Sequence, residues 1–94
     1  MIKSWKDSAT RRFAESGKSG FPGLDRELAV SRLNTLDSAV SLREISPLKS
    51  VGLHKLKGDR KGQWAMTVNC PWRLCFRFRD GNAYDVELTD YHRG

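Results

Sequence analysis

The feature that most restricts the fold is a strict alternation of apolar and polar side chains along residues 72–79. Successive side chains of a β-strand point to opposite faces of its sheet, so this pattern predicts a strand with one buried and one cationic face. The apolar positions are Trp72, Leu74, Phe76 and Phe78, and the positions between them are Arg73, Cys75, Arg77 and Arg79.

Strand-like patterns flank this segment on both sides. The chain takes on strand character from Leu53, and residues 64–68 and 84–89 both alternate. An Asn-Cys-Pro turn at 69–71 and an Asp-Gly-Asn hairpin signal at 80–82 separate them, which predicts three consecutive antiparallel strands. The buried parity is expected to carry Trp64, Met66, Val68, Tyr84, Val86 and Leu88.

The first half of the chain has helical patterns. Residues 2–6 alternate and suggest a short first strand, after which Asp7 or Ser8 is a suitable cap for a helix ending near Gly17. A second helix is expected from Leu24 to Ala39. Its inner side should carry Ala29, Leu33, Leu36 and Val40, and its outer side Arg26, Arg32 and Asp37.

Together these elements predict an α+β fold in which two N-terminal helices pack on one face of a small, mainly antiparallel β-sheet. Ninety-four residues suffice for one domain spanning 1–94. No segment is left over to cover the other face of the sheet, so we expect that face to be open to solvent.

The charge of the chain indicates an anionic partner. Seventeen Lys and Arg against eleven Asp and Glu give a formal charge of +6. We expect the open face to carry Lys55 and Lys57 beside the three arginines of 73–79, which suits a phosphate backbone. With no long apolar run and no signal-peptide-like start, the chain is expected to be cytoplasmic, without a membrane partner.

The composition argues against disulfides and metal sites. Cys70 and Cys75 are the only cysteines, and the two histidines lie far apart in sequence, which does not fit a disulfide framework or a structural zinc site. Both cysteines are expected to be buried or half-buried and not nucleophilic. Trp64 and Trp72 are expected to belong to the core.

Several segments carry a family resemblance. Leu-Lys-Gly-Asp-Arg-Lys-Gly-Gln-Trp at 56–64, Trp-Arg-Leu-Cys-Phe at 72–76 and Asp-Tyr-His at 90–92 occur in series, with Met-Ile-Lys-Ser-Trp at 1–5 and Leu-Asn-Thr-Leu-Asp at 33–37. This series resembles the HigB toxins of the RelE/ParE superfamily over nearly the whole chain. Ala-Met at 65–66 and the two residues after His92 are minor departures.

The resemblance implies a RelE-like fold and a toxin of a type II toxin–antitoxin system. It implies a ribosome-dependent endoribonuclease that cuts messenger RNA in the decoding site, often at adenine-containing codons, without metal or cofactor. The implied partners are the ribosome, mRNA and a HigA-like helix-turn-helix antitoxin. The toxin is expected to contact operator DNA only indirectly, through this antitoxin. Carried over to this sequence, the family's functional residues are His54, Lys57, Arg73, Asp90, Tyr91 and His92.

The residue types fit RNA cleavage by attack of the 2′-hydroxyl on the adjacent phosphorus, which needs proton transfer and cations around the phosphorane. We assign Lys57 and Arg73 to the phosphate, His92 to proton transfer and Asp90 to orienting the His92 ring. Tyr91 and His54 are expected to stack on a base or assist proton transfer. Further RNA contacts are expected from Lys55, Arg60, Lys61, Arg77 and Arg79.

For Asp90, Tyr91 and His92 to line one site, the last strand must end or twist by about Asp90. Three alternatives remain open: a ParE-type gyrase inhibitor with the same fold, a basic nucleic-acid-binding module without catalysis, and a degraded toxin that only binds its antitoxin. Lys57 together with the terminal Asp-Tyr-His favours the nuclease over the gyrase inhibitor.

Overall fold

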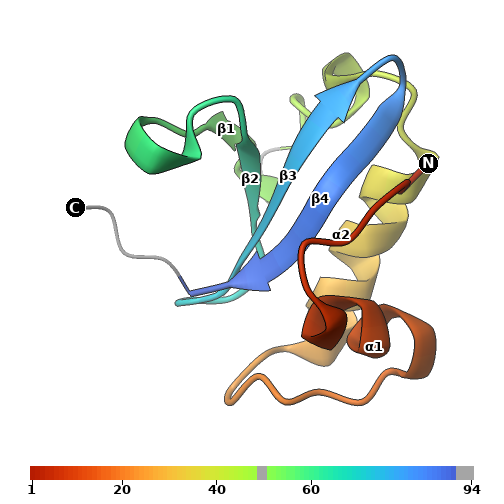
Figure 1. Cartoon of the computed structure of the whole chain (residues 1–94), viewed down its shortest axis with the longest axis vertical. Coiled ribbons are helices and arrows are strands. Elements are labelled where there is room, and N and C mark those ends of the chain that lie inside the picture. The colour runs from red at the N-terminus through yellow and green to blue at the C-terminus, as the bar shows by residue number, and fades with distance from the viewer. Residues whose placement is uncertain (49–50, 91–94) are drawn as a thin grey trace.

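The computed structural model describes residues 1–48 and 51–90, so Tyr91 and His92 lie outside the described residues. Two α-helices come first in the chain and four strands follow, as Figure 1 shows. The helices are α1 (Ser8–Ser16) and α2 (Arg26–Ser38), with 3-10 turns η1 (Leu42–Glu44) and η3 (Gly58–Arg60); the strands are β1 (His54–Lys55), β2 (Trp64–Thr67), β3 (Arg73–Arg79) and β4 (Asn82–Thr89).

The four strands form an antiparallel sheet in the order β1-β2-β3-β4. The N-terminal residues add to its edge, because Ile2 bridges to Ala83 and Trp5 to Val86, both in parallel orientation. The Lys3 amide donates to the Ala83 carbonyl at 2.8 Å. The predicted alternation at 2–6 is thus satisfied by isolated bridges along β4, and the sheet is mainly antiparallel as expected.

The first helix begins and ends at the predicted caps. The Asp7 carboxylate accepts from the Thr10 amide at 2.8 Å, and Gly17 ends α1 in the left-handed conformation with φ of 75°. Asp25 caps α2 in the same way as Asp7 caps α1, so α2 begins two residues after the predicted start at Leu24.

Two side chains of the second helical segment lie elsewhere than predicted. Val40 is 68% exposed because α2 ends at Ser38, so the helical periodicity no longer applies to it. Arg32 was expected to face outward, but it is buried, and its Nε donates to the Thr67 carbonyl at 2.8 Å. The apolar stem of an arginine can pack in a core when its guanidinium finds acceptors.

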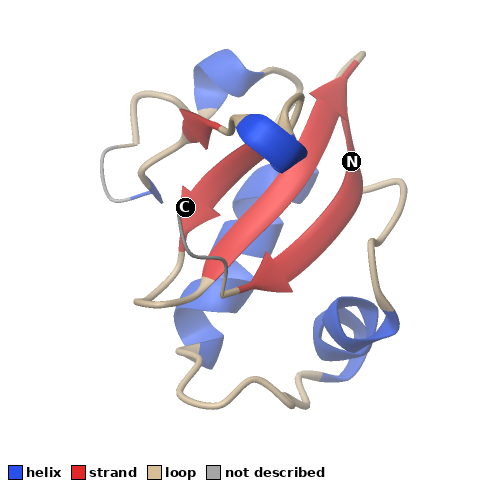
Figure 2. Cartoon of the chain, turned by 60° about the vertical axis from the view of Figure 1, so that its left-hand side comes forward, coloured by secondary structure: helices blue, strands red, loops and turns tan. Residues whose placement is uncertain are grey.

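The main core lies between the helices and one face of the sheet. It contains Phe13 from α1, Leu36 from α2 and the side chains of β2 and β3 that face the helices. Trp64, Trp72 and Phe78 are half-buried and pack against this core. In Figure 2, α2 lies behind the sheet and a short helical turn lies in front of it. The predicted α+β architecture is confirmed. Within the described residues, no helix combines the length and apolar character that crossing a membrane requires.

A bulge in β4 places Tyr84 on the other face of the sheet from the one predicted. Cys75 lies opposite Glu87, whereas Arg77 lies opposite Tyr84, so β4 contains one extra residue between the two pairs. Asp85 sits in this bulge with φ of 53°. Ala83 therefore occupies the core position and Tyr84 lies on the opposite face with Arg77, contrary to the prediction.

The second face of the sheet, opposite the helices, is partly covered, which was not predicted. The chain between β1 and β2 folds back over it, and Leu56 joins Ala65 and Cys75 in a small buried cluster. Cys75 is buried as expected, but Cys70 is exposed in the β2–β3 turn. The turn η3 is held in this covering segment, in front of the strands in Figure 2.

Candidate active site

The register of the sheet determines which side chains share the second face. His54 lies opposite Ala65, Ala65 opposite Cys75, and Cys75 opposite Glu87, which makes one row across all four strands. The next row on the same face runs from Thr67 through Arg73 to Thr89. The sheet thus brings His54, Arg73 and Glu87 to one surface from segments far apart in sequence.

Arg73 begins β3 and its side chain is half-buried. Its Nη1 donates to the carbonyl of the preceding Trp72 at 3.3 Å. Among residues 1–48 and 51–90, no carboxylate lies within ion-pair distance of this guanidinium. Its charge is therefore available to an anionic ligand such as a phosphate.

Asp90 lies close to Arg73 along the backbone. β4 ends at Thr89, the residue directly opposite Arg73, and Asp90 is the next residue. The prediction that the strand ends by Asp90 is confirmed. Tyr91 and His92 lie outside the described residues, so their expected position beside Arg73 stays a prediction.

Lys57 comes from the segment that covers the second face, and His54 from β1, the strand just before it. The His54 ring is half-buried in β1, with Nδ1 2.9 Å from the Gly52 carbonyl oxygen. Lys57 is exposed and directly precedes η3, which lies over the sheet. The fold of residues 56–63 therefore fixes where the Lys57 ammonium can reach.

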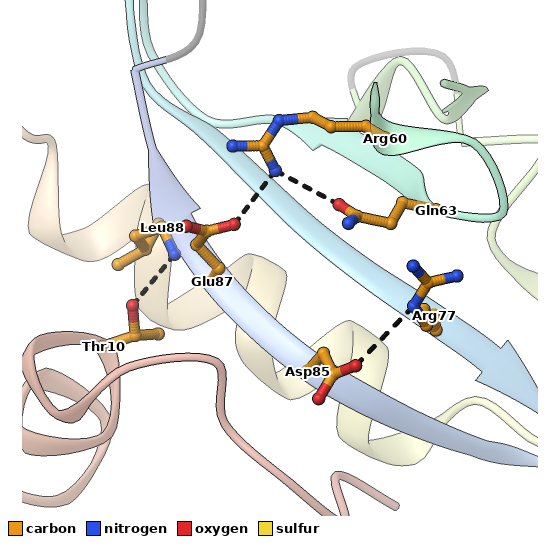
Figure 3. A network of polar contacts seen from close by, with 7 residues as sticks. All are labelled: Thr10, Arg60, Gln63, Arg77, Asp85, Glu87 and Leu88. Atoms are coloured by element: carbon orange, nitrogen blue, oxygen red, sulfur yellow. Dashed lines mark hydrogen bonds and ion pairs between the residues drawn. The ribbon is translucent and has the colours of Figure 1, made fainter. Parts of the chain in front are cut away.

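Arg60, expected to contact RNA, is engaged with the protein itself. Its Nη1 lies 3.0 Å from Glu87 Oε1 and 3.2 Å from Gln63 Oε1 (Figure 3). The two charged side chains are 27% and 17% exposed, so the pair is largely withdrawn from water. Glu87 was not a predicted site residue.

Arg77 and Arg79 lie at the far end of β3. Arg79 is about 20 Å along the strand from Arg73. Arg77 Nε is 3.6 Å from an Asp85 oxygen, as Figure 3 shows, and Arg79 stacks over Tyr84 at 4.5 Å. Both arginines are exposed. They extend the cationic surface away from the Arg73 end of the sheet.

The two remaining lysines differ in position. Lys61 is exposed just after η3. Lys55 lies opposite Trp64, which belongs to the helix side of the sheet, and its Nζ is 5.6 Å from the Trp64 ring centroid. The expectation that Lys55 and Arg73 share a face is wrong. The register of β1 and β2 places His54, and not Lys55, on the face of Arg73.

Cys75 lies at the centre of the second face, beneath these charges. Burial raises the pKa of its thiol to about 11, while the nearby Arg60 and Arg73 guanidinium groups lower it and Glu87 raises it further. The thiol is therefore protonated at neutral pH and does not act as a nucleophile. Glu87 lies directly opposite Cys75, and Arg73 lies two residues before Cys75 on the same face.

The described site is rich in cations and poor in metal ligands. Within residues 1–48 and 51–90, no three His, Cys, Asp or Glu side chains come together in a way that would hold a metal ion. Arg73, Lys57 and the imidazole of His54 are groups that can bind a phosphodiester and stabilise charge on its oxygens.

Comparison with known proteins identifies the family and the fold of the chain. Residues 3–92 match the HigB-like toxin family, described as the RelE-like toxin of type II toxin–antitoxin system HigB. The chain is 40% identical to Endoribonuclease HigB of Proteus vulgaris over 93 residues, covering 98% of this chain and all of that protein. The crystal structure of a YafQ mutant from E. coli has the same fold, with a TM-score of 0.61, 16% identity, and coverage of 96% of this chain and 91% of that one. The chain therefore belongs to the HigB-like family of RelE-like toxins of type II toxin–antitoxin systems.

Proposed function

We propose that this toxin is a ribosome-dependent endoribonuclease that cleaves messenger RNA in the decoding site and thereby arrests translation and growth. The name of its Proteus vulgaris relative supports the nuclease activity. The observation that carries the proposal is the position of Arg73, half-buried on the second face opposite the last residue of β4, with no carboxylate partner among the described residues.

The proposed reaction uses the nucleophile of the RNA. The 2′-oxygen attacks the adjacent phosphorus while the bond to the 5′-oxygen breaks, which leaves a 2′,3′-cyclic phosphate and a 5′-hydroxyl. Arg73 and Lys57 neutralise the charge that develops on the nonbridging oxygens. This chemistry requires no cofactor.

Proton transfer is assigned to the end of the chain. His92 exchanges the proton of the 2′-hydroxyl or of the leaving oxygen, since an imidazole titrates near neutral pH. Asp90 orients that ring, and Tyr91 and His54 stack on a base or assist the transfer. Lys61, Arg77 and Arg79 contact the RNA backbone farther from the scissile phosphate.

Membership of a type II toxin–antitoxin family implies an antitoxin partner. We infer that this partner is a HigA-like helix-turn-helix protein, that operator DNA is bound only through it, and that the toxin acts in the cytoplasm on the ribosome and mRNA. The 94 residues act as one toxin domain in this proposal.

The test uses translating ribosomes, a defined message and EDTA, and compares the wild type with Arg73→Gln. Loss of the guanidinium should lower the cleavage rate by about 100-fold, because a preorganised charge at the phosphorane is lost. Arg12→Gln, which removes the same charge from an exposed position on α1, should cleave within about twofold of wild type. Equal rates for Arg73→Gln and wild type would contradict the assignment.

His92→Gln separates the nuclease from a binding module. The nuclease proposal predicts that both RNA cleavage and growth arrest are lost, since proton transfer fails. A basic module without catalysis, or a gyrase inhibitor, would still arrest growth when this imidazole is replaced. Growth arrest by His92→Gln without detectable cleavage would therefore overturn the proposal.

A further inference from the structure

We propose that Arg60 and Glu87 form a positioning pair that holds η3 over the sheet and keeps the guanidinium of Arg73 free for the RNA phosphate. The inference rests on the proposed nuclease function and assigns Arg60 a role other than direct contact with RNA. It is carried by the ion pair between η3 and β4 and by the charges around it.

The covering segment has few attachments to the sheet. β1 contains only two residues, and the turn itself is closed by short-range bonds such as Leu56 N to the Gln63 carbonyl at 2.9 Å. Leu56 is its one buried side chain. The Arg60–Glu87 contact at 3.0 Å is a polar attachment that reaches across β2 and β3 to β4 (Figure 3). Lys57, which precedes η3, depends on this attachment for its position.

The same pair determines what Arg73 can bind. Glu87 lies opposite Cys75, so Glu87 and Arg73 are diagonal neighbours on one face, a separation that long side chains can bridge. With Arg60 present, the Glu87 carboxylate is already neutralised. Asp85, the other carboxylate of β4, is paired with Arg77. Without Arg60, the carboxylate of Glu87 would turn to Arg73 and would also repel the RNA.

This arrangement predicts a particular order among variants. Arg60→Gln leaves Glu87 unpaired and should lower kcat/KM by about tenfold. Glu87→Gln removes the attachment but also the competing carboxylate, and should cost less. The double variant Arg60→Gln/Glu87→Gln should be more active than Arg60→Gln alone, because no carboxylate remains to capture Arg73.

A direct RNA contact by Arg60 gives the opposite pattern. Arg60→Gln would then cost the same factor with Glu87 present or replaced, and that additivity would overturn the inference. Arg60→Lys keeps the charge and should recover most of the activity. As a control, Arg11→Gln breaks an exposed ion pair with Glu15, 3.9 Å apart on α1, and should leave the rate unchanged.

An NMR measurement tests the pair independently of catalysis. The side-chain Nε–H resonance of Arg73 should shift in Arg60→Gln and return toward its wild-type position in the double variant. An unchanged resonance in Arg60→Gln would contradict the capture of Arg73 even if the wild type cut no RNA. If Arg60→Gln does not fold, the Arg60→Lys and Glu87→Gln variants decide by the same two readouts.

Discussion

Burial of the Cys75 thiol under the covering segment makes the stability of the protein depend on pH in the alkaline range. The pKa of this thiol is about 11 in the folded chain against a reference of 9.0. Between these values the unfolded chain loses the thiol proton while the folded chain keeps it, so ionisation favours unfolding. Stability should therefore fall as the pH rises above 9, and the loss should be complete above 11.

The two-unit difference corresponds to about 2.7 kcal/mol, or about 1.4 kcal/mol lost by pH 10. The assay is urea unfolding at pH 8 to 10.5 on the wild type, Cys75→Ala and Cys70→Ala. Only Cys75→Ala should lose this component of the pH dependence, because it removes the buried thiol. Cys70→Ala removes an exposed thiol and should follow the wild type.

Parallel pH dependence in wild type and Cys75→Ala would refute the argument. It would mean that water reaches Cys75 and that residues 56–63 do not cover the second face. The placement of Lys57 and Arg60 over the sheet would then fail with it, since both depend on the same segment.

Two buried polar groups give further predictions. Thr10→Val should destabilise the fold by about 1–3 kcal/mol in urea unfolding. The Thr10 hydroxyl accepts from the Leu88 amide at 3.0 Å, and without it this buried donor has no acceptor. Thr10→Ser keeps the hydroxyl and should restore most of the lost stability. Arg32→Met loses the hydrogen bond to the Thr67 carbonyl and should lower the free energy of unfolding by about 1.5–3 kcal/mol. As a control, Arg26→Met at the exposed start of α2 should lower it by less than about 0.5 kcal/mol. Equal urea midpoints for the two variants would count against the buried role of Arg32.

Local signals were sufficient for most of the architecture. The Asp7 cap, Gly17 and the alternation of β3 each reflect short-range chemistry, and each lies where the sequence predicts. The parity of Tyr84 could not be predicted, because an inserted bulge residue is not visible in an alternating pattern. Arg32 was misplaced since helical periodicity cannot reveal an acceptor such as the Thr67 carbonyl.

The candidate site was predictable in composition but not in arrangement. The residue types of Lys57, Arg73 and Asp90 follow from the motifs. The end of β4 before Asp90 was predicted because the last three motif residues were expected to line one site. The partner of Arg60 could not be inferred, because η3 and β4 meet only through the folding of the covering segment onto the second face. The side of Lys55 depends on a two-residue strand too short to show its own parity.

The central claim is that the protein supplies charge and proton transfer while the RNA supplies its own nucleophile. The most direct measurement uses a ribosome-bound message with a single 2′-deoxynucleotide placed at the position where the wild-type toxin cuts. The account predicts that this message stays intact there, and that the all-ribose message yields a 2′,3′-cyclic phosphate. Cleavage at the deoxynucleotide at an undiminished rate would contradict it.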